Sequence, residues 1–149
     1  MDFYVVLEGD IGRDVLRVFR EMRQVVEALP HYMLPNGVVI SCHLLCRALV
    51  EQYSGGKGLP KFSVVDGYFT KGYEHSWLTT ADRRAILDMY PVAGAAPFVV
   101  ATDIMSPWRG MYVPSNDFQK KLRGPQFKED VAILAAQVKE TVECLKIPW

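Results

Sequence analysis

Apolar residues recur with helical spacing in two segments of the chain. From Asp10 to Leu29 they stand at every third or fourth position, which is typical of one buried helical stripe. Asp10 is suited to cap this helix and Pro30 to end it. The segment from Pro125 to Leu145 has the same period, and proline suits the first helical position. The apolar positions are Val15, Val18, Phe19, Met22, Val25, Val26 and Leu29 in the first segment, and Phe127, Val131, Leu134, Val138, Val142 and Leu145 in the second.

The middle of the chain predicts one more helix and a set of strands. Turn residues in 31–37 indicate a loop that leads into a helix running to about Tyr53, and the glycine-rich run 54–58 predicts a flexible connection. Four ranges then have the β-branched and aromatic content of strands, the first three separated by short polar turns that favour an antiparallel meander. These ranges are 61–70, 73–80, 84–90 and 98–102.

The order helix, helix, strands, helix predicts an α+β domain with helices packed on a mostly antiparallel sheet. The stretch around Pro107, Trp108, Gly110 and Pro114 is assigned only as a loop. The chain has 149 residues, and we expect residues 1–149 to form a single domain around one core.

Charge and cysteine content narrow the class of protein. Seventeen basic and seventeen acidic residues give a net charge of zero, so no global field favours nucleic acid or an anionic membrane. The first ten residues lack the basic start of a signal peptide, and no apolar stretch has the length of a membrane span. The three cysteines form an odd set that favours reduced thiols. We therefore expect a soluble cytoplasmic protein that binds neither nucleic acid nor membrane.

Cys42 is the first candidate for chemistry. Cys42, Leu45, Cys46 and Leu49 have the spacing of one helix face, which is expected to meet the rest of the protein. If Ser41 or Asn36 is the N-cap, Cys42 begins the helix, where the helix dipole and free N–H groups favour a thiolate. The alternative interpretation is that both thiols are small core hydrophobes.

A nucleophilic thiol needs a base, and the base needs an orienting partner. If strands 73–80 and 84–90 form a hairpin that turns at Ala81-Asp82, residues whose numbers sum to 163 face each other. His75 and Asp88 would then be direct cross-strand neighbours, with the second ring nitrogen of His75 free for the thiol of Cys42. The hypothesis depends on this register, because a slip of one residue places the pair on opposite faces.

Two other residues are weaker candidates for the base and for the orienting acid. His43 follows Cys42 directly, and consecutive helical residues project about 100° apart, so we expect the two side chains not to face each other. Asp66 is a second candidate for the orienting acid, but it precedes Gly67 at an expected bend, and a role in the turn explains it equally well.

Four short motifs follow one another between residues 37 and 91. They are Cys42-x-x-Leu45-x-x-Ala48-Leu49, Val65-Asp66-Gly67-Tyr68, His75-Ser76-Trp77-Leu78 and Ile86-Leu87-Asp88-Met89-Tyr90-Pro91. In this order and spacing they resemble the core of the transglutaminase-like and papain-like cysteine protease superfamily. The resemblance implies a papain-like or transglutaminase-like fold, with Cys42 attacking an amide or thioester carbonyl, His75 acting as the base and Asp88 orienting it.

The sequence offers several candidates for the groups that would stabilise an oxyanion, and it does not choose among the side chains. The backbone N–H of Cys42 is a candidate donor, since it lies at a helix start. Side chains in the preceding loop are further candidates, namely His31, Tyr32 and Asn36, although each of them has an alternative role as a surface or capping residue.

The resulting hypothesis is a cysteine hydrolase, a peptidase or amidase that forms an acyl-enzyme with a peptide, protein or amide substrate. The alternatives are an acyltransferase or transglutaminase of the same fold, and a catalytically silent protein-binding module. We expect neither a cofactor nor a metal, because Cys42, His43, Cys46 and His75 lack the second ligand pair of a zinc site. The run Gly55-Gly56-Lys57-Gly58 lacks the full spacing of a phosphate-binding loop.

Overall fold

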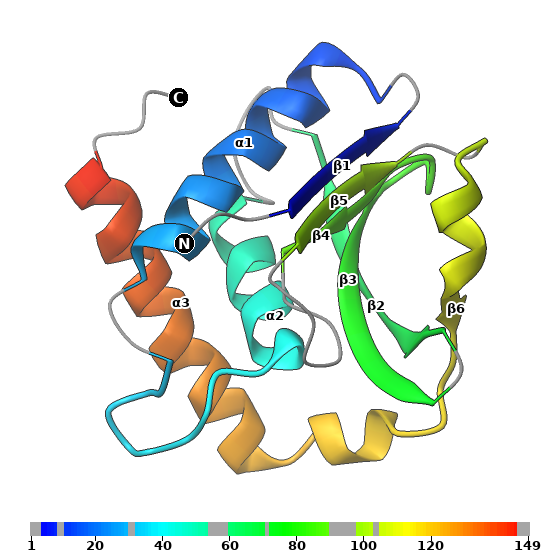
Figure 1. The fold of residues 1–149 in the computed structure, drawn as a ribbon. Helices are drawn as coiled ribbons and strands as arrows, with labels where there is room; N and C mark the ends of the chain where they lie inside the picture. The colour runs from blue at the N-terminus through cyan, green and yellow to red at the C-terminus, as the bar shows by residue number, and fades with distance from the viewer. Residues whose placement is uncertain are drawn as a thin grey trace.

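The computed structural model describes residues 4–8, 11–29, 32–53, 60–70, 72–89, 98–102 and 105–145. Within them, three α-helices accompany a six-stranded sheet and two short 3-10 helices (Figure 1). The elements are β1 (Tyr4–Glu8), α1 (Arg13–Ala28), α2 (Cys42–Tyr53), β2 (Phe62–Phe69), β3 (Tyr73–Thr80), β4 (Ile86–Asp88), β5 (Phe98–Thr102), η1 (Pro107–Met111), β6 (Tyr112–Pro114), η2 (Gln119–Leu122) and α3 (Pro125–Leu145).

The helix predictions are confirmed, with one correction at the start of α1. α3 spans Pro125–Leu145 as predicted, and α2 ends at Tyr53. α1 begins at Arg13, and its N-cap is Gly12 at φ 86 rather than Asp10. Asp10, Pro30 and the run 54–58 lie outside the described residues. None of the described helices combines the length and apolar character needed to cross a membrane.

The sheet has the order β1-β5-β4-β3-β2-β6. Its centre is the predicted antiparallel meander of β2, β3 and β4, and β5 continues it in antiparallel pairing with β4. β1, which the sequence analysis did not assign, pairs in parallel with β5 at one edge. The protein is therefore an α+β domain with a mostly antiparallel sheet.

The hairpin register between β3 and β4 differs from the predicted one. Leu78 lies opposite Leu87 and Thr79 opposite Ile86, so paired numbers sum to 165 and not to 163. The connection is longer than the two residues assumed, because the Asp82 carboxylate accepts hydrogen bonds from the Thr80 hydroxyl and the Arg84 N–H and thereby closes a wider turn. A shift of two residues keeps every side chain on its predicted face.

The two faces of the sheet have separate apolar clusters. The larger core lies between the helices and the face that carries Leu78 and Leu87, while the second cluster contains Trp77, Ile86, Phe69 and Tyr112. Successive strand residues point to opposite faces of the sheet, so the neighbours Trp77 and Leu78 belong to different clusters. Figure 1 shows α1, α2 and α3 on one side of the sheet and η1 away from them on the other, before β6 at the edge of the sheet.

β6 lies in the stretch assigned only as a loop, and a glycine permits its pairing with β2. Gly67 lies opposite Pro114. A Cβ atom at Gly67 would lie 2.8 Å from the Pro114 Cα atom and 2.9 Å from the Trp77 ring, closer than real Cβ contacts. The glycine of the Val65-Asp66-Gly67-Tyr68 motif therefore lets β6 approach the sheet.

Candidate active site

Cys42 is the first residue of α2, as the capping argument predicted. Ser41 is the cap, since its hydroxyl oxygen accepts the Leu44 N–H at 3.2 Å and its carbonyl accepts the Leu45 N–H at 2.9 Å. A first-turn N–H has no partner within its own helix, so the backbone N–H of Cys42 points out of the helix terminus. The residue is 7 % exposed. Its thiol is therefore covered by protein and lies near the positive end of the helix dipole.

The structure brings His75 and Asp88 into direct contact. The His75 Nε2 atom lies 2.7 Å from the Asp88 Oδ2 atom, and the two side chains are 4 % and 0 % exposed. The predicted direct cross-strand pairing is wrong. Because Leu78 lies opposite Leu87 in the observed register, Asp88 lies diagonally from His75, and on its other side it pairs with Val100 of β5. The imidazole is long enough to span this diagonal.

The same histidine acts on the Cys42 thiol and lowers its pKa. The Nε2 atom of His75 is engaged by Asp88, so Nδ1 is the ring nitrogen left to interact with the thiol. Cys42, His75 and Asp88, from α2, β3 and β4, thus influence one another's ionisation. These are the three residues singled out from the sequence, and the order Cys–imidazole–carboxylate is that of a nucleophile, a base and an orienting acid.

The electrostatics of this chain favour an ion pair. Burial raises the pKa of the Cys42 thiol, but hydrogen bonds and positive charge from His43 and His75 outweigh it and lower the pKa to about 6. Burial lowers the pKa of His75, but the charge and hydrogen bond of Asp88, together with those of Cys42, raise it to about 10. Between these two values the thiolate and the imidazolium coexist.

Tyr112 is a further member of the site that the sequence analysis missed. Its hydroxyl donates a hydrogen bond of 2.9 Å to the same Asp88 oxygen that contacts His75. Burial, and then the Asp88 charge, raise the pKa of Tyr112, so the phenol keeps its proton. The available signal was the short run Tyr112-Val113-Pro114, since proline is confined to edge strands and strand ends.

Replacing Tyr112 with phenylalanine should destabilise the protein while keeping its ring contacts with Trp77 and Phe69. A hydrogen bond to a buried charge contributes about 1.5 to 3 kcal/mol, and the free energy of unfolding should fall by that amount. Urea denaturation measures the change. Tyr68→Phe is the matched control, because Tyr68 donates only an exposed bond of 3.3 Å to Asp117. Equal losses in the two variants would contradict a special role for the Tyr112 hydroxyl.

A second hydrogen-bonded chain begins at His43, the residue after Cys42. The His43 Nδ1 atom lies 2.6 Å from the Ser76 Oγ atom, which in turn lies 2.6 Å from the Asp66 Oδ1 atom. Both guanidinium NH groups of Arg47 donate to Asp66, at 3.2 and 2.8 Å. Burial raises the pKa of Asp66, but the hydrogen bonds from Arg47 and Ser76 lower it further, so the carboxylate is ionised.

One expectation about this region is wrong, and another stays a prediction. The described hydrogen bond of the His43 ring is with Ser76, so the expectation that His43 does not face the thiol stays a prediction. Asp66 is not a turn residue, since it lies within β2 and is 6 % exposed. It does not contact His75 in any described hydrogen bond, and its partners are Ser76, Arg47 and Gln119.

The remaining sequence candidates have structural roles or lie elsewhere. Cys46 is 1 % exposed and burial raises its pKa, so it is a core thiol of the kind considered for both cysteines. The Asn36 amide donates to Asp130 of α3 and its oxygen accepts the Val38 N–H, which ties the loop to the fold. Tyr32 is 81 % exposed. His31, Tyr90 and Pro91 lie outside the described residues.

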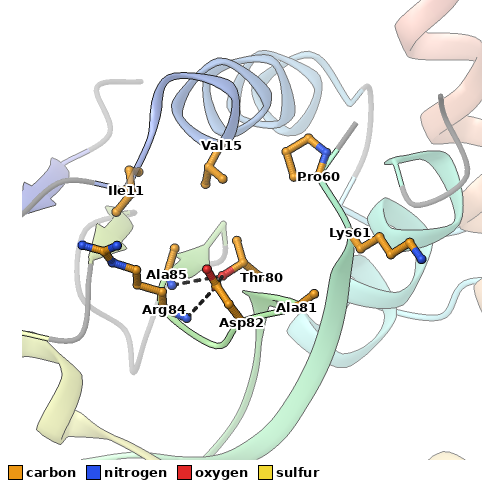
Figure 2. A pocket seen from close by; sticks show the side chains of 9 residues that line it. All are labelled: Ile11, Val15, Pro60, Lys61, Thr80, Ala81, Asp82, Arg84 and Ala85. Atoms are coloured by element: carbon orange, nitrogen blue, oxygen red, sulfur yellow. Dashed lines mark hydrogen bonds between the residues drawn. The ribbon is translucent and has the colours of Figure 1, made fainter. Parts of the chain in front are cut away.

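The described surface also has two hollows whose lining residues do not include Cys42, although the second is lined in part by Asp66 and Tyr112. Figure 2 shows a pocket of about 260 Å³ between Ile11 and Val15 on one side and the β3–β4 turn on the other. Its polar atoms at Thr80 and Asp82 are engaged in closing that turn. A second cavity of about 350 Å³ lies against β2, β3 and β6. Among the described residues, no three His, Cys, Asp or Glu side chains are grouped to hold a metal.

Comparison with known proteins found no family model, no curated protein and no solved structure that matches this chain. The assignment of chemistry therefore depends on the geometry of the residues themselves.

Proposed function

We propose that the protein is a cysteine hydrolase, a peptidase or amidase with a transglutaminase-like or papain-like core. Cys42 is the nucleophile, His75 the acid and base, and Asp88 the orienting carboxylate. The observation that carries the proposal is the buried contact of His75 with Asp88 at 2.7 Å, next to a thiol at the first position of a helix. A thiolate beside an imidazolium is the activated form of a cysteine nucleophile.

Acylation begins with attack of the Cys42 thiolate on the carbonyl carbon of an amide. The C–S bond forms as the carbonyl π electrons move to oxygen, and the N–H groups at the start of α2 are placed to stabilise this oxyanion. The carbonyl re-forms, the C–N bond breaks, and His75 gives its Nδ1 proton to the departing amine. The products are a free amine, a thioester on Cys42 and a neutral His75.

Deacylation reverses the proton flow. Neutral His75 takes a proton from water at Nδ1, and the hydroxide attacks the thioester carbonyl. The C–S bond then breaks, and a carboxylic acid leaves while the thiolate and imidazolium are restored. Asp88 holds the ring in one orientation and stabilises its charge through both steps. If an amine takes the place of water, the product is a new amide, so product analysis separates hydrolysis from acyl transfer.

The thiolate–imidazolium pair predicts an unusual pH dependence of alkylation. The rate constant for modification of Cys42 by iodoacetamide should rise as the pH passes through about 6 and be near its plateau at pH 7, whereas an ordinary thiol ionises near pH 8.5 (about 2.5 units higher). Mass spectrometry of peptides measures Cys42 and the exposed Cys144 in one sample. In His75→Ala the midpoint for Cys42 should move upward, because its charged partner is lost.

His43→Asn serves as a comparison that retains His75. The proposal fails if Cys42 reacts no faster than Cys144 below pH 7, or if its midpoint is the same in wild type and in His75→Ala. Circular dichroism of each variant establishes that the fold is retained before rates are compared.

A further inference from the structure

The cavity of about 350 Å³ against β2, β3 and β6 carries positive charge that the proposed function does not use. Arg83 and Arg109 line it, and neither guanidinium forms an ion pair with a described carboxylate. Arg83 is exposed, and no described residue accepts a hydrogen bond from its side chain. None of Cys42, His75 and Asp88 lines this cavity, so it lies outside the candidate triad.

Arg109 is held in place by the turn between β3 and β4. One of its NH groups donates to the Arg84 carbonyl at 2.8 Å, and the other donates to the Arg83 carbonyl. A guanidinium has five N–H donors, so three remain for a ligand. Because Arg109 contacts the backbone of the turn that carries Arg83, both charges lie on the same side of the cavity. Positive charges gathered in a concave surface concentrate the field that attracts an anion.

Much of the remaining lining is apolar. Val65 and Pro114 are accessible to solvent, and the buried side chains of Trp77 and Ile86 complete this part of the lining. The side chain of Asn116 adds an amide that has no described hydrogen-bond partner. A volume of about 350 Å³ falls within the range of small-molecule sites, which combine apolar walls with a few polar groups. The lining therefore suits a ligand with an apolar body and one anionic group.

Asp66 also lines the cavity, and it limits the charge that a ligand can carry. Its carboxylate accepts hydrogen bonds from Arg47, Ser76 and Gln119. Arg47 forms an ion pair with it, but an anion in the cavity is still repelled in proportion to its own charge. A carboxylate has one negative charge, whereas a phosphate monoester has nearly two at neutral pH. The carboxylate is therefore the better match.

We propose that this cavity binds a small carboxylic acid with an apolar body, and that Arg83 and Arg109 hold its carboxylate. Arginine pairs with carboxylates through two parallel hydrogen bonds, which orients the bound group. The apolar body then covers Val65 and Pro114. Tyr112, the donor to Asp88, belongs to the same lining, so the ligand lies one side chain away from the candidate triad.

The test is isothermal titration calorimetry of the full chain with benzoate as the probe. Arg83→Gln and Arg109→Gln should each weaken benzoate binding by about tenfold or more, because a hydrogen bond between charged groups is lost. Arg20→Gln is the matched control, since it removes the same charge from an exposed position of α1 on the other side of the sheet. This control should bind benzoate as the wild type does.

Two further probes separate the charge of the ligand from its apolar body. Benzamide is close to benzoate in size but neutral, so it should bind at least about tenfold more weakly. Inorganic phosphate is an anion without an apolar body, and it should also bind at least about tenfold more weakly. Because Arg83 bonds to no described residue, Arg83→Gln should fold normally, and circular dichroism checks this.

Binding that falls in Arg83→Gln and persists in Arg20→Gln supports the proposal. Equal affinities of these two variants would refute the role of Arg83. Absence of saturable benzoate binding by the wild type, or equal binding of benzamide, would overturn the carboxylate site. Phosphate that binds as tightly as benzoate would overturn the part assigned to the apolar body. Each of these results is independent of the reactivity of Cys42.

Discussion

Replacing Cys42 with alanine should abolish acylation of the protein by an activated ester. The thiol is the atom that forms the new bond, and loss of the nucleophile in related constellations leaves only the small contribution of binding and oxyanion stabilisation. Incubation with p-nitrophenyl acetate followed by intact-mass measurement should show one acetyl group on the wild-type chain. In Cys42→Ala the rate should fall by at least about 10³-fold.

Two other cysteine variants serve as controls for this experiment. Cys144→Ala removes an exposed thiol of α3, and Cys46→Ala removes a buried thiol one turn from Cys42. Both should retain the acetyl adduct and its rate at pH 7. An adduct that persists in Cys42→Ala, or that disappears in Cys144→Ala, would place the reactive group elsewhere and contradict the assignment.

Asp88→Asn should cause the second large loss, about 10² to 10⁴-fold in the acylation rate at pH 7. The amide is close in size to the carboxylate but carries no charge, so the main group that raises the His75 pKa is lost while burial still lowers it. The imidazolium then loses its proton at lower pH, and the Cys42 thiolate loses a positive partner. The rate against pH should lose its plateau between the two ionisations and rise only in alkaline solution.

Asp117→Asn is the control for that substitution, because Asp117 is exposed and accepts a bond from Tyr68. Its rate and pH profile should match the wild type. If Asp88→Asn folds, as judged by circular dichroism, and keeps the wild-type profile, Asp88 has no orienting role. Thermal unfolding measured alongside separates a loss of stability from a loss of chemistry.

Local patterns were sufficient to predict most of the elements. The helical stripe that contains Val18 and Met22 and the β-branched and aromatic content of β2 and β3 are properties of a single segment, so the local sequence indicates them directly. β1 was missed because its pairing with β5 joins segments far apart in sequence. β6 was missed because it has three residues and is held by contacts with β2 instead of by a pattern of its own.

The sequence predicted which face of a helix or strand each candidate side chain occupies, but not the contacts between different elements. A capping serine fixed Cys42 at a helix start, and the predicted shared face of His75 and Asp88 survived a register error of two residues because the side-chain period is two. Tyr112 and the link from His43 through Ser76 were not predictable, because they depend on packing between elements that no single segment encodes.

The low pKa of the candidate thiol depends on groups on separate elements, α2, β3 and β4, and Asp88 of β4 in turn accepts a hydrogen bond from Tyr112 of β6. A denatured chain keeps Cys42 and His43 as neighbours but separates them from His75 and Asp88. Electrophile labelling of Cys42 at neutral pH would therefore discriminate between native and unfolded molecules. A small thiol reagent could count the correctly folded fraction of a preparation, with Cys144 in the same chain as the internal standard.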